Sequence, residues 1–507
     1  MNRIFKILAA VALFSVFSSP SSVSYAQDAE YNLIRRTYKV NTDGTMDISF
    51  RKEIKLLRNR AITAYADKGE TFILYNPATD RLTINESYTI RKDGSRVQTP
   101  QNAFIDQLPS QCTDCGRYNG IRERVVVHTA LEYDCIIVLD YTIHRQGSYL
   151  DEALVLVEDC PVKKYEVIVD LPKDSEQSID YTVAHGDFKI KTLNDKHTFH
   201  QIATDLPQKY IDNYLPAVET LYPTVHISCG KRPSDIVESS AEKLPEAAYT
   251  VGELHDNDQL TYATNIRNYV LDNIHTTDFP LSLVGYKRSS AKETFLSGCG
   301  TPADKKRLVA AMLREAGFGA EEYDNGIHVT VTEDGRPMTY NLSTDSKRPA
   351  RLDGAAIDEQ RTIDISRDLV WNGPRVGGSY KQMTLPTENG SISIDPAFLT
   401  SVRKAPLKVR NCNEKYHYTI ALPRTPKHTL VKPIDISRTE KGIGTIRISI
   451  KQLPTGQIDI IRELSIDVKD GIVSPKQYKA FRRMMQDWTT NKTVTIRAEK
   501  GKPIIGN

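Results

Sequence analysis

The chain has 507 residues, of which 39% are hydrophobic and 26% charged, and its net charge of +3 is spread along the sequence. This composition is close to the globular average, and no basic run is long enough to favour nucleic acid as a partner. At roughly 100 to 200 residues per domain, a chain of this length is expected to form several domains, and we expect three.

Residues 1–26 have the pattern of a secretory signal. A short basic start precedes an apolar run from Ile7 to Phe17, and small residues at Ser24 and Ala26 fit a cleavage site. The run is shorter than the about 20 residues that cross a bilayer, and no later stretch comes closer, so we expect no membrane span after cleavage. The sequence therefore predicts an exported protein in the periplasm, at the outer surface or secreted.

Residues 27–232 carry mostly strand patterns and predict an N-terminal β domain, either a β-sandwich or one large sheet. Between Tyr165 and Leu171, apolar and polar residues alternate with the period of two that a sheet with distinct faces requires. The β-branched runs Arg124–His128 and Cys135–Leu139 are interpreted as a hairpin. Turns are predicted at three pairs: Asp43-Gly44, Asp93-Gly94 and Gly186-Asp187.

Residues 233–348 predict a compact α+β domain. Apolar residues at steps of three and four from Leu260 to Ile274 indicate an amphipathic helix, with a cap among Asp256–Asp258. A second helix is expected from Pro302, with Thr301 as N-cap, an acidic residue in its first turn and Gly317 at its end. A hairpin from Ile327 to Leu342 follows.

Residues 349–507 predict a C-terminal β-sandwich. A hairpin is expected from two strands around Pro454-Thr-Gly456. A helix that starts at Ser474-Pro475 and a final strand over Thr493–Ala498 complete it. The predicted fold is thus multidomain and mainly β, with a central α+β domain.

The seven cysteines allow disulfides in an exported protein, and their odd number leaves at least one unpaired within the chain. Cys112 and Cys115, together with Cys135 and Cys160, could also form a four-thiolate zinc site, or a redox pair at the CxxC. The spacing is loose and no helix pattern follows Cys112, so disulfides or free thiols are favoured. We predict no metal and no cofactor.

Three residues of the α+β domain stand in the order of a thiol-enzyme triad. Such an enzyme needs a cysteine at a helix N-terminus, a histidine base and an Asn or Asp that orients the imidazole. Cys299, His328 and Asn341 follow this order. The alternative for Cys299 is an ordinary loop cysteine before a capped helix, and for His328 a strand histidine with a hydrogen-bond partner.

The block from Gly300 to Gly317 resembles the active-site helix of transglutaminase-like domains, which typically reads Gly-Asp-Cys-Lys-Asp-Lys-Ala-x-Leu before a Leu-rich helix that ends in Ala-Gly. The matching residues are Asp304, Lys305, Leu308, Leu313, Ala316 and Gly317. The resemblance implies a papain-like middle domain. It places the family nucleophile at Pro302, the histidine at His328 and the acid at Ser343.

The flanks extend this resemblance. Arg91–Ser95, Arg122–His128 and Tyr141–Ile143 are similar to the domain of unknown function that precedes transglutaminase-like domains in many Gram-negative exports. Arg462–Ile466 and Ser474–Tyr478 resemble the β-sandwich that commonly follows.

Because proline and serine occupy two of the three catalytic positions, the first hypothesis is a non-catalytic member that binds or scaffolds a protein or peptide in the cell envelope. A second hypothesis is an active cysteine protease or transglutaminase-type acyltransferase on peptide amides, with Cys299 as nucleophile, His328 as base and Asn341 as orienter. A third is a structural envelope component whose contacts come from the β domains.

Overall fold

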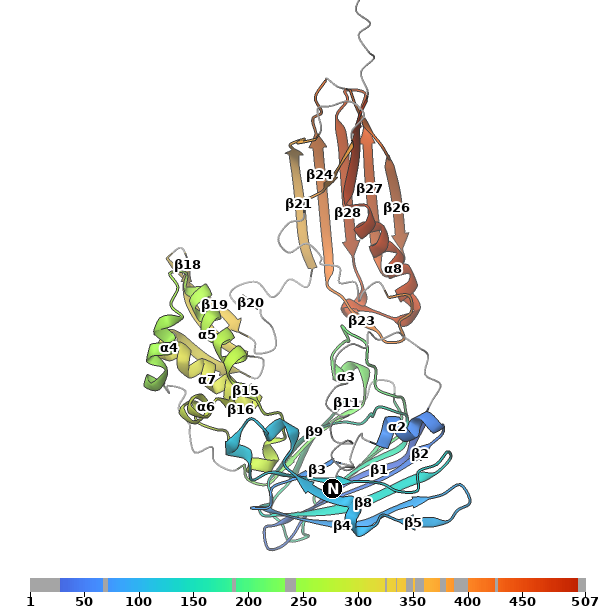
Figure 1. The fold of residues 1–507 in the computed structure, drawn as a ribbon, viewed down its shortest axis with the longest axis vertical. Helices are drawn as coiled ribbons and strands as arrows, with labels where there is room; N and C mark the ends of the chain where they lie inside the picture. The colour runs from blue at the N-terminus through green and yellow to red at the C-terminus, as the bar shows by residue number, and fades with distance from the viewer. Residues whose placement is uncertain are drawn as a thin grey trace, which may run out of the picture.

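The structure is a computed structural model that describes residues 28–66, 72–184, 188–232, 243–323, 326–333, 335–342, 350–351, 360–373, 380–386, 400–424 and 427–499. Figure 1 shows N-terminal sheets at the bottom of the view, a helical unit on the left and C-terminal sheets at the top. The predicted signal at 1–26 lies outside the described residues. So do segments 233–242 and 343–349, where the predicted domain boundaries fall, and these boundaries stay predictions.

The N-terminal part is built on an eight-stranded sheet in the order β12-β13-β10-β1-β2-β8-β4-β5. Its strands are β1 (Ala29–Val40), β2 (Met46–Leu56), β4 (Asp80–Ile90), β5 (Arg96–Gln98), β8 (Ile136–Arg145), β10 (Val162–Asp170), β12 (Ile190–Asn194) and β13 (Thr198–Leu206). Neighbours are antiparallel except β1 and β10, which run parallel. The predicted alternation is confirmed in β10, where Tyr165, Val167 and Val169 are buried.

Two of the three predicted turns are confirmed in this sheet. Gly44 joins β1 to β2 with φ of 83°, and Gly94 joins β4 to β5 with φ of 85°. These are conformations that glycine adopts at no steric cost. The third turn, at Gly186-Asp187, lies outside the described residues.

The predicted hairpin between Arg124–His128 and Cys135–Leu139 is wrong. The first run lies in β7 (Arg122–Val126), which pairs with β3 (Phe72–Tyr75) and β6 (Phe104–Gln107) in a separate sheet. The second run lies in β8, between β2 and β4 of the large sheet. β-Branched residues favour a strand without specifying its partner, and the connection between the runs is too long for a two-residue turn.

A third sheet of the N-terminal part consists of β9 (Leu150–Val155), β14 (Thr224–Cys229) and β11 (Ile179–Ala184). Two short helices accompany these sheets, α2 (Asn59–Ala66) and α3 (Val218–Leu221). One buried apolar cluster includes residues of the large sheet and of this third sheet, so the two share a core.

The middle part packs helices against a small antiparallel sheet. The helices are α4 (Ala248–Glu253), α5 (Gln259–Asn273), α6 (Ala291–Ser297) and α7 (Pro302–Glu315), and the sheet is β17 (Gly319–Tyr323), β18 (Gly326–Glu333), β19 (Arg336–Leu342) and β20 (Ala350–Arg351). Both predicted helices are confirmed, and the Asp258 side chain caps α5 by accepting from the Thr261 amide. The predicted hairpin is β18 and β19.

The C-terminal part has a five-stranded sheet in the order β21-β24-β28-β27-β26 and a three-stranded sheet in the order β22-β30-β25. The bounds are β21 (Gln360–Leu369), β22 (Tyr380–Thr384), β24 (Asn411–Ile420), β25 (His428–Leu430), β26 (Ile434–Glu440), β27 (Gly444–Gln452), β28 (Ile458–Ile466), α8 (Pro475–Thr490) and β30 (Thr493–Ala498). Residues of both sheets and of α8 form one core. The predicted hairpin, helix and final strand are confirmed as β27–β28, α8 and β30.

The fold is therefore mainly β, with several sheets and several domains. Within the ranges that the structure describes, no helix has both the length and the apolar character needed to cross a membrane.

A half-buried histidine with shielded ring nitrogens makes the stability of the N-terminal part dependent on pH. Both ring nitrogens of His128 are shielded and without a hydrogen-bond partner among the described residues. Burial, with a smaller contribution from Lys52, lowers the pKa of His128 from 6.5 to about 3. Between these values the unfolded chain binds a proton that the folded chain does not.

We expect the melting temperature to fall as the pH drops from 6.5 towards 3, because protonation then favours the unfolded chain. His128→Leu should flatten this dependence, whereas the same change at the exposed His275 should not. Circular dichroism melts at stepped pH measure the slopes. Equal slopes in wild type and His128→Leu would contradict the assignment.

Candidate functional site

The start of α7 is the segment where the sequence places a catalytic cysteine. Thr301 is the N-cap and Pro302 occupies the first turn, where its missing N–H costs no hydrogen bond. The Thr301 side chain accepts from the Asp304 amide, and the Asp304 carboxylate accepts from the Thr301 amide, which completes a capping box. This helix start is built as the sequence predicts, with proline where the pattern that the sequence resembles has its nucleophilic cysteine.

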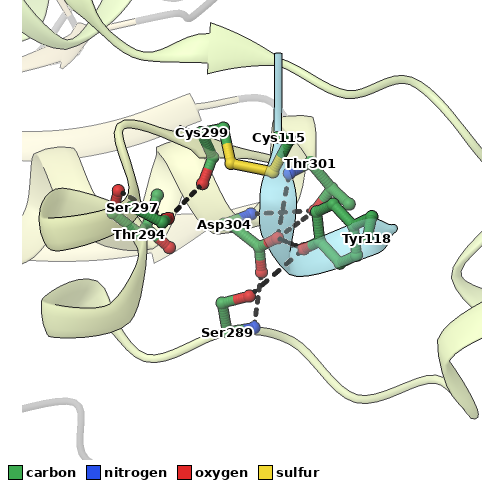
Figure 2. The surroundings of a disulfide bond; sticks show 8 residues. All are labelled: Cys115, Tyr118, Ser289, Thr294, Ser297, Cys299, Thr301 and Asp304. Carbon is green, nitrogen blue, oxygen red and sulfur yellow. Dashed lines mark hydrogen bonds between the residues drawn. A yellow bond between two sulfur atoms is a disulfide. The ribbon is translucent and has the colours of Figure 1, made fainter. Parts of the chain in front are cut away.

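Cys299 is joined to Cys115 by a disulfide that links the N-terminal part to the start of α7 (Figure 2). The two Cα atoms are 5.7 Å apart, although 184 residues separate the cysteines in the chain. Both residues are only 1% exposed. Cys299 lies in β16 (Cys299–Gly300), which pairs with β15 (His275–Thr276), and Cys115 lies between the short helices η2 (Ser110–Cys112) and η3 (Gly116–Tyr118).

An apolar cluster surrounds the disulfide. It contains Cys112, Cys115, Tyr118 and Ile121 from the N-terminal part and Phe279, Leu283 and Cys299 from the middle part. Cys112 is a free, fully buried thiol in this cluster. Burial, and less strongly Glu123, raises the pKa of the Cys112 thiol, so its reactive thiolate form is disfavoured.

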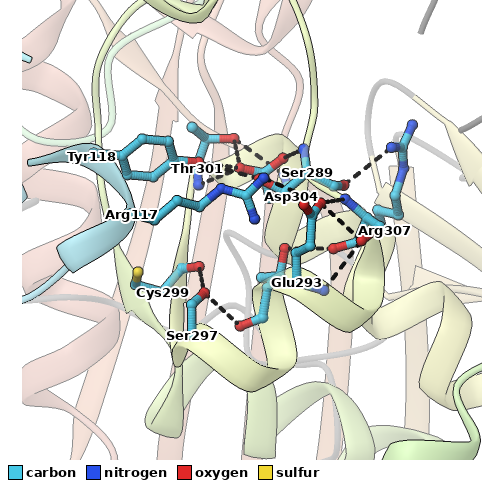
Figure 3. Close-up of polar contacts among 11 residues, drawn as sticks. Arg117, Tyr118, Ser289, Glu293, Ser297, Cys299, Thr301, Asp304 and Arg307 are labelled. Atoms are coloured by element: carbon cyan, nitrogen blue, oxygen red, sulfur yellow. Dashed lines mark hydrogen bonds and ion pairs between the residues drawn. The ribbon is translucent and has the colours of Figure 1, made fainter. Parts of the chain in front are cut away.

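The Asp304 carboxylate joins the two parts through hydrogen bonds (Figure 3). Its Oδ1 accepts from the Ser289 amide at 2.6 Å. Its Oδ2 accepts from the Tyr118 hydroxyl at 3.1 Å and from the Thr301 amide and hydroxyl at 2.9 and 2.8 Å. Asp304 is only 1% exposed, so this carboxylate is a structural acceptor whose oxygens are already engaged.

Further polar contacts surround this junction. Arg117, next to Tyr118, pairs with Glu293 of α6 at 3.1 Å. The side chain of Arg307 in α7 donates to the Ser289 carbonyl at 3.1 Å. Burial raises the pKa of Tyr118 to about 12, so its hydroxyl stays protonated and donates to Asp304 at neutral pH.

His328 and Asn341 come together on the small sheet. They are Cα partners in the β18–β19 ladder, and His328 is also opposite Glu321 of β17. The His328 ring stacks on Tyr323, with ring centroids 3.9 Å apart. Its Nε2 is shielded from solvent and has no hydrogen-bond partner in the described ranges.

The His328 side chain lies on the face of this sheet opposite to α7. Its neighbours Ile327, Val329 and Val331 are at most 1% exposed and belong to the core that contains the apolar residues of α7. Because side chains alternate along a strand, His328 faces the other way. The structure thus pairs His328 with Asn341, while Cys299 is bonded to Cys115 in a separate cluster.

Ser343, which the resemblance aligns with the acid of the triad, lies outside the described residues. The triad Cys299, His328 and Asn341 stays a prediction. The sequence did not single out Tyr118 or Ser289, because short irregular segments carry no periodic pattern. It also did not identify Cys115 as the partner of Cys299, because disulfide connectivity cannot be deduced from seven cysteines.

The four cysteines of the alternative four-thiolate zinc site are divided between two clusters. Cys112 and Cys115 belong to the cluster around the disulfide, of which Cys115 is a member, whereas Cys135 and Cys160 lie in the N-terminal core. Among the described residues, no group of three or more His, Cys, Asp and Glu side chains is placed to hold a metal ion.

Two family models match parts of the chain. A domain of unknown function with a solved structure, DUF3857, matches residues 42–209, and a second such domain, DUF3858, matches residues 384–497. No curated protein sequence matches the chain.

Among solved structures, a crystal structure of a Parabacteroides distasonis protein described as a "putative protease" is similar, with a TM-score of 0.63 and 21% identity. The match covers 92% of this chain and 99% of that one, and shows a shared fold. Two crystal structures of an M1 zinc metallopeptidase from Deinococcus radiodurans, the first of them a mutant, align with TM-scores of 0.18 and 0.19 and identities of 9% and 8%. They cover 56% and 57% of this chain and 63% and 64% of the metallopeptidase chains, and scores this low support no functional argument.

We expect the disulfide to stabilise the protein by about 2 to 4 kcal/mol, because it closes a very long loop in the unfolded chain. Reductant should therefore lower the melting temperature of wild type, and the Cys115→Ala/Cys299→Ala double variant should melt at the lower temperature with or without reductant. Cys112→Ala should keep the response to reductant. Scanning calorimetry makes the measurement, and a wild-type melt that reductant leaves unchanged would contradict the disulfide.

Tyr118→Phe removes the hydroxyl that donates to the buried Asp304 carboxylate. A hydrogen bond to a charged group contributes about 1.5 to 3 kcal/mol, so we expect a loss of this size in the free energy of unfolding. Tyr133→Phe is the matched control, because Tyr133 is 47% exposed and should change stability by less than about 0.5 kcal/mol. Urea unfolding compares them, and equal values for the two variants would refute a role for this contact.

Proposed function

We propose that this protein is an exported, transglutaminase-like protein whose middle part is non-catalytic and serves as a binding or scaffolding module in the cell envelope. The observation that carries the proposal is the start of α7. Pro302 occupies the nucleophile position of the family, and the nearest thiol, Cys299, is bonded to Cys115.

The chemistry of a thiol enzyme requires a free thiolate close to its base. In the oxidised protein Cys299 is bonded to Cys115, so its sulfur carries no proton and cannot become a thiolate. The proline at the family position has no nucleophilic atom. The position of His328 on the sheet face opposite to α7 supports the same conclusion.

The disulfide and the Asp304 contacts also support a scaffolding role. They join the middle part to the N-terminal part by a covalent bond and by the buried hydrogen bond that Tyr118 donates to Asp304. A connection of this kind fixes the arrangement of the two parts. Export is supported by the sequence of residues 1–26 and by the disulfide, since disulfides persist in oxidising compartments.

The second candidate is an active thiol hydrolase or acyltransferase. The Parabacteroides distasonis protein with a similar fold, described as a "putative protease", favours it. This activity would require reduction of the Cys115–Cys299 bond before Cys299 could attack an amide. A structural envelope component, with contacts made by the β parts, is the third candidate.

The test measures thiol reactivity and turnover in the same preparation of full-length mature protein. Iodoacetamide labelling across pH, read by peptide mass spectrometry, should leave Cys299 unlabelled in the folded, oxidised protein. Release of ammonia from a glutamine peptide should equal that of Cys299→Ser, with and without reductant.

One result would favour the enzyme instead. Labelling of Cys299 well below pH 7 that disappears in His328→Ala would indicate a thiolate activated by the imidazole. Amide hydrolysis that is lost in both variants would lead to the same conclusion. A matched alanine substitution at the exposed His275 controls for nonspecific effects.

A further inference from the structure

A cleft of about 540 Å³ lies in the N-terminal part, away from the disulfide. Its volume is within the range of about 300 to 1,000 Å³ that is typical of ligand sites. Strands β4 and β5 form one side, and residues around β6 and β7 form the other. The lining residues are Ile84, Asn85, Glu86, Ser87, Tyr88, Arg96, Gln98, Thr99, Gln101, Phe104 and Arg124.

The cleft follows the edge of β4. Five consecutive residues of this strand, Ile84 to Tyr88, line it. Side chains on a regular strand alternate between two faces, so a cavity bordered by five consecutive residues is expected to run along the strand edge. A bulge between Ile84 and Glu86 accompanies this exposure.

This edge is open where the cleft lies. On one side β4 pairs with β8 over its whole length. On the other side β5 pairs only with Tyr88–Ile90, and the last contact is from the Thr99 amide to the Ser87 carbonyl. In the described part of the chain, no strand pairs with Asp80–Glu86 on that side. The cleft therefore begins where β5 ends and extends beside β4 in the direction of β5.

Of the three charged lining residues, Arg96 has no oppositely charged partner in the described ranges. Arg124 donates two hydrogen bonds of 2.6 Å to Asp106 and holds the pKa of that carboxyl below its usual value. Glu86 accepts from Arg51 at 2.7 Å. Arg96 is exposed, and its guanidinium lies 4.9 Å from the Tyr88 ring centroid.

We propose that this cleft binds an extended peptide segment that carries a carboxylate. The peptide adds to β4 as a strand in line with β5, and its carboxylate pairs with Arg96. Main-chain groups of the open β4 edge provide affinity, as in other cases of strand addition. The edge that β5 leaves unpaired, Asp80–Glu86, spans seven residues at roughly 3.3 Å each, about 23 Å, which is long enough for a peptide of about five residues.

The carboxylate has two possible sources, an acidic side chain or a free C-terminus. Arg96 can donate two parallel hydrogen bonds to either, while the Tyr88 ring supports its guanidinium. The exposed amides of Gln98 and Gln101 add donors and acceptors for a polar peptide. This inference rests on the proposed binding role and gives it a site and a class of ligand.

The probes are fluorescein-labelled pentapeptides of alternating Thr and Val, with a single Glu at each position in turn and a C-terminal amide. A second set lacks Glu and ends in a free carboxylate. A third set repeats the best binder with N-methyl groups at alternate amides, which removes main-chain donors. Fluorescence anisotropy measures binding to the full-length protein, and hydrogen exchange follows the amides of Ile84–Ser87.

We expect at least one probe to bind and to slow amide exchange at Ile84–Ser87. Alternate amides of the peptide can be methylated in two ways, at the odd or at the even positions. At least one of these two methylated versions should bind more weakly than the unmethylated probe. Arg96→Glu should weaken binding by at least about tenfold, because a charge-assisted hydrogen bond is lost and repulsion is introduced. Arg81→Glu, at an exposed position of β4 outside the cleft, should leave binding unchanged. The first two sets distinguish a side-chain from a C-terminal carboxylate.

No binding of any probe up to about 1 mM would overturn the proposal. Equal affinity of a probe for wild type and Arg96→Glu would overturn the proposal as well. So would unchanged affinity when the odd amides and when the even amides of the peptide are methylated. These outcomes are separate from those of the thiol test. A reactive Cys299 would end the non-catalytic proposal while the cleft result stands, and an unoccupied cleft would leave the thiol result unaffected.

Discussion

The contact between the N-terminal part and the start of α7 is the constraint on which the rest of the account depends. It combines a buried disulfide between Cys115 and Cys299 with the Asp304 carboxylate, which accepts from Tyr118 on one side and from Ser289 and Thr301 on the other. A buried carboxylate is stable only when its oxygens are satisfied. The helix cap and the domain contact therefore stabilise each other. The segment that resembles a catalytic centre forms a structural contact between the N-terminal part and the middle part.

This arrangement explains why a departure at Pro302 from the active-site pattern that the sequence resembles is compatible with a well-formed helix start. Proline is favourable at the first position of a helix, and the capping box needs only Thr301 and Asp304. The helix thus keeps its start without a nucleophile. The binding role that we propose then requires a surface elsewhere. The open edge of β4 lies in the N-terminal part, where the resemblance to thiol enzymes carries no information.

Local chemistry was predictable from the sequence, whereas long-range pairing was not. Caps and turns such as Thr301, Asp258, Gly44 and Gly94 depend on neighbours within a few residues, and the structure confirms them. The partner of a strand depends on the whole sheet, so the hairpin that was predicted for β7 and β8 is wrong. The disulfide joins residues 184 positions apart, and no local pattern identifies such a pair. The outward position of His328 was predictable, because Ile327, Val329 and Val331 alternate around it.

The most direct test of the central claim is disulfide mapping of the full-length protein isolated from the cell without reductant. Free thiols are blocked during unfolding, and the peptides are then analysed by mass spectrometry. The account predicts a cross-linked pair containing Cys115 and Cys299, and blocked thiols at Cys112, Cys135, Cys160, Cys229 and Cys412. A blocked thiol at Cys299, or a bond between Cys112 and Cys115, would contradict it.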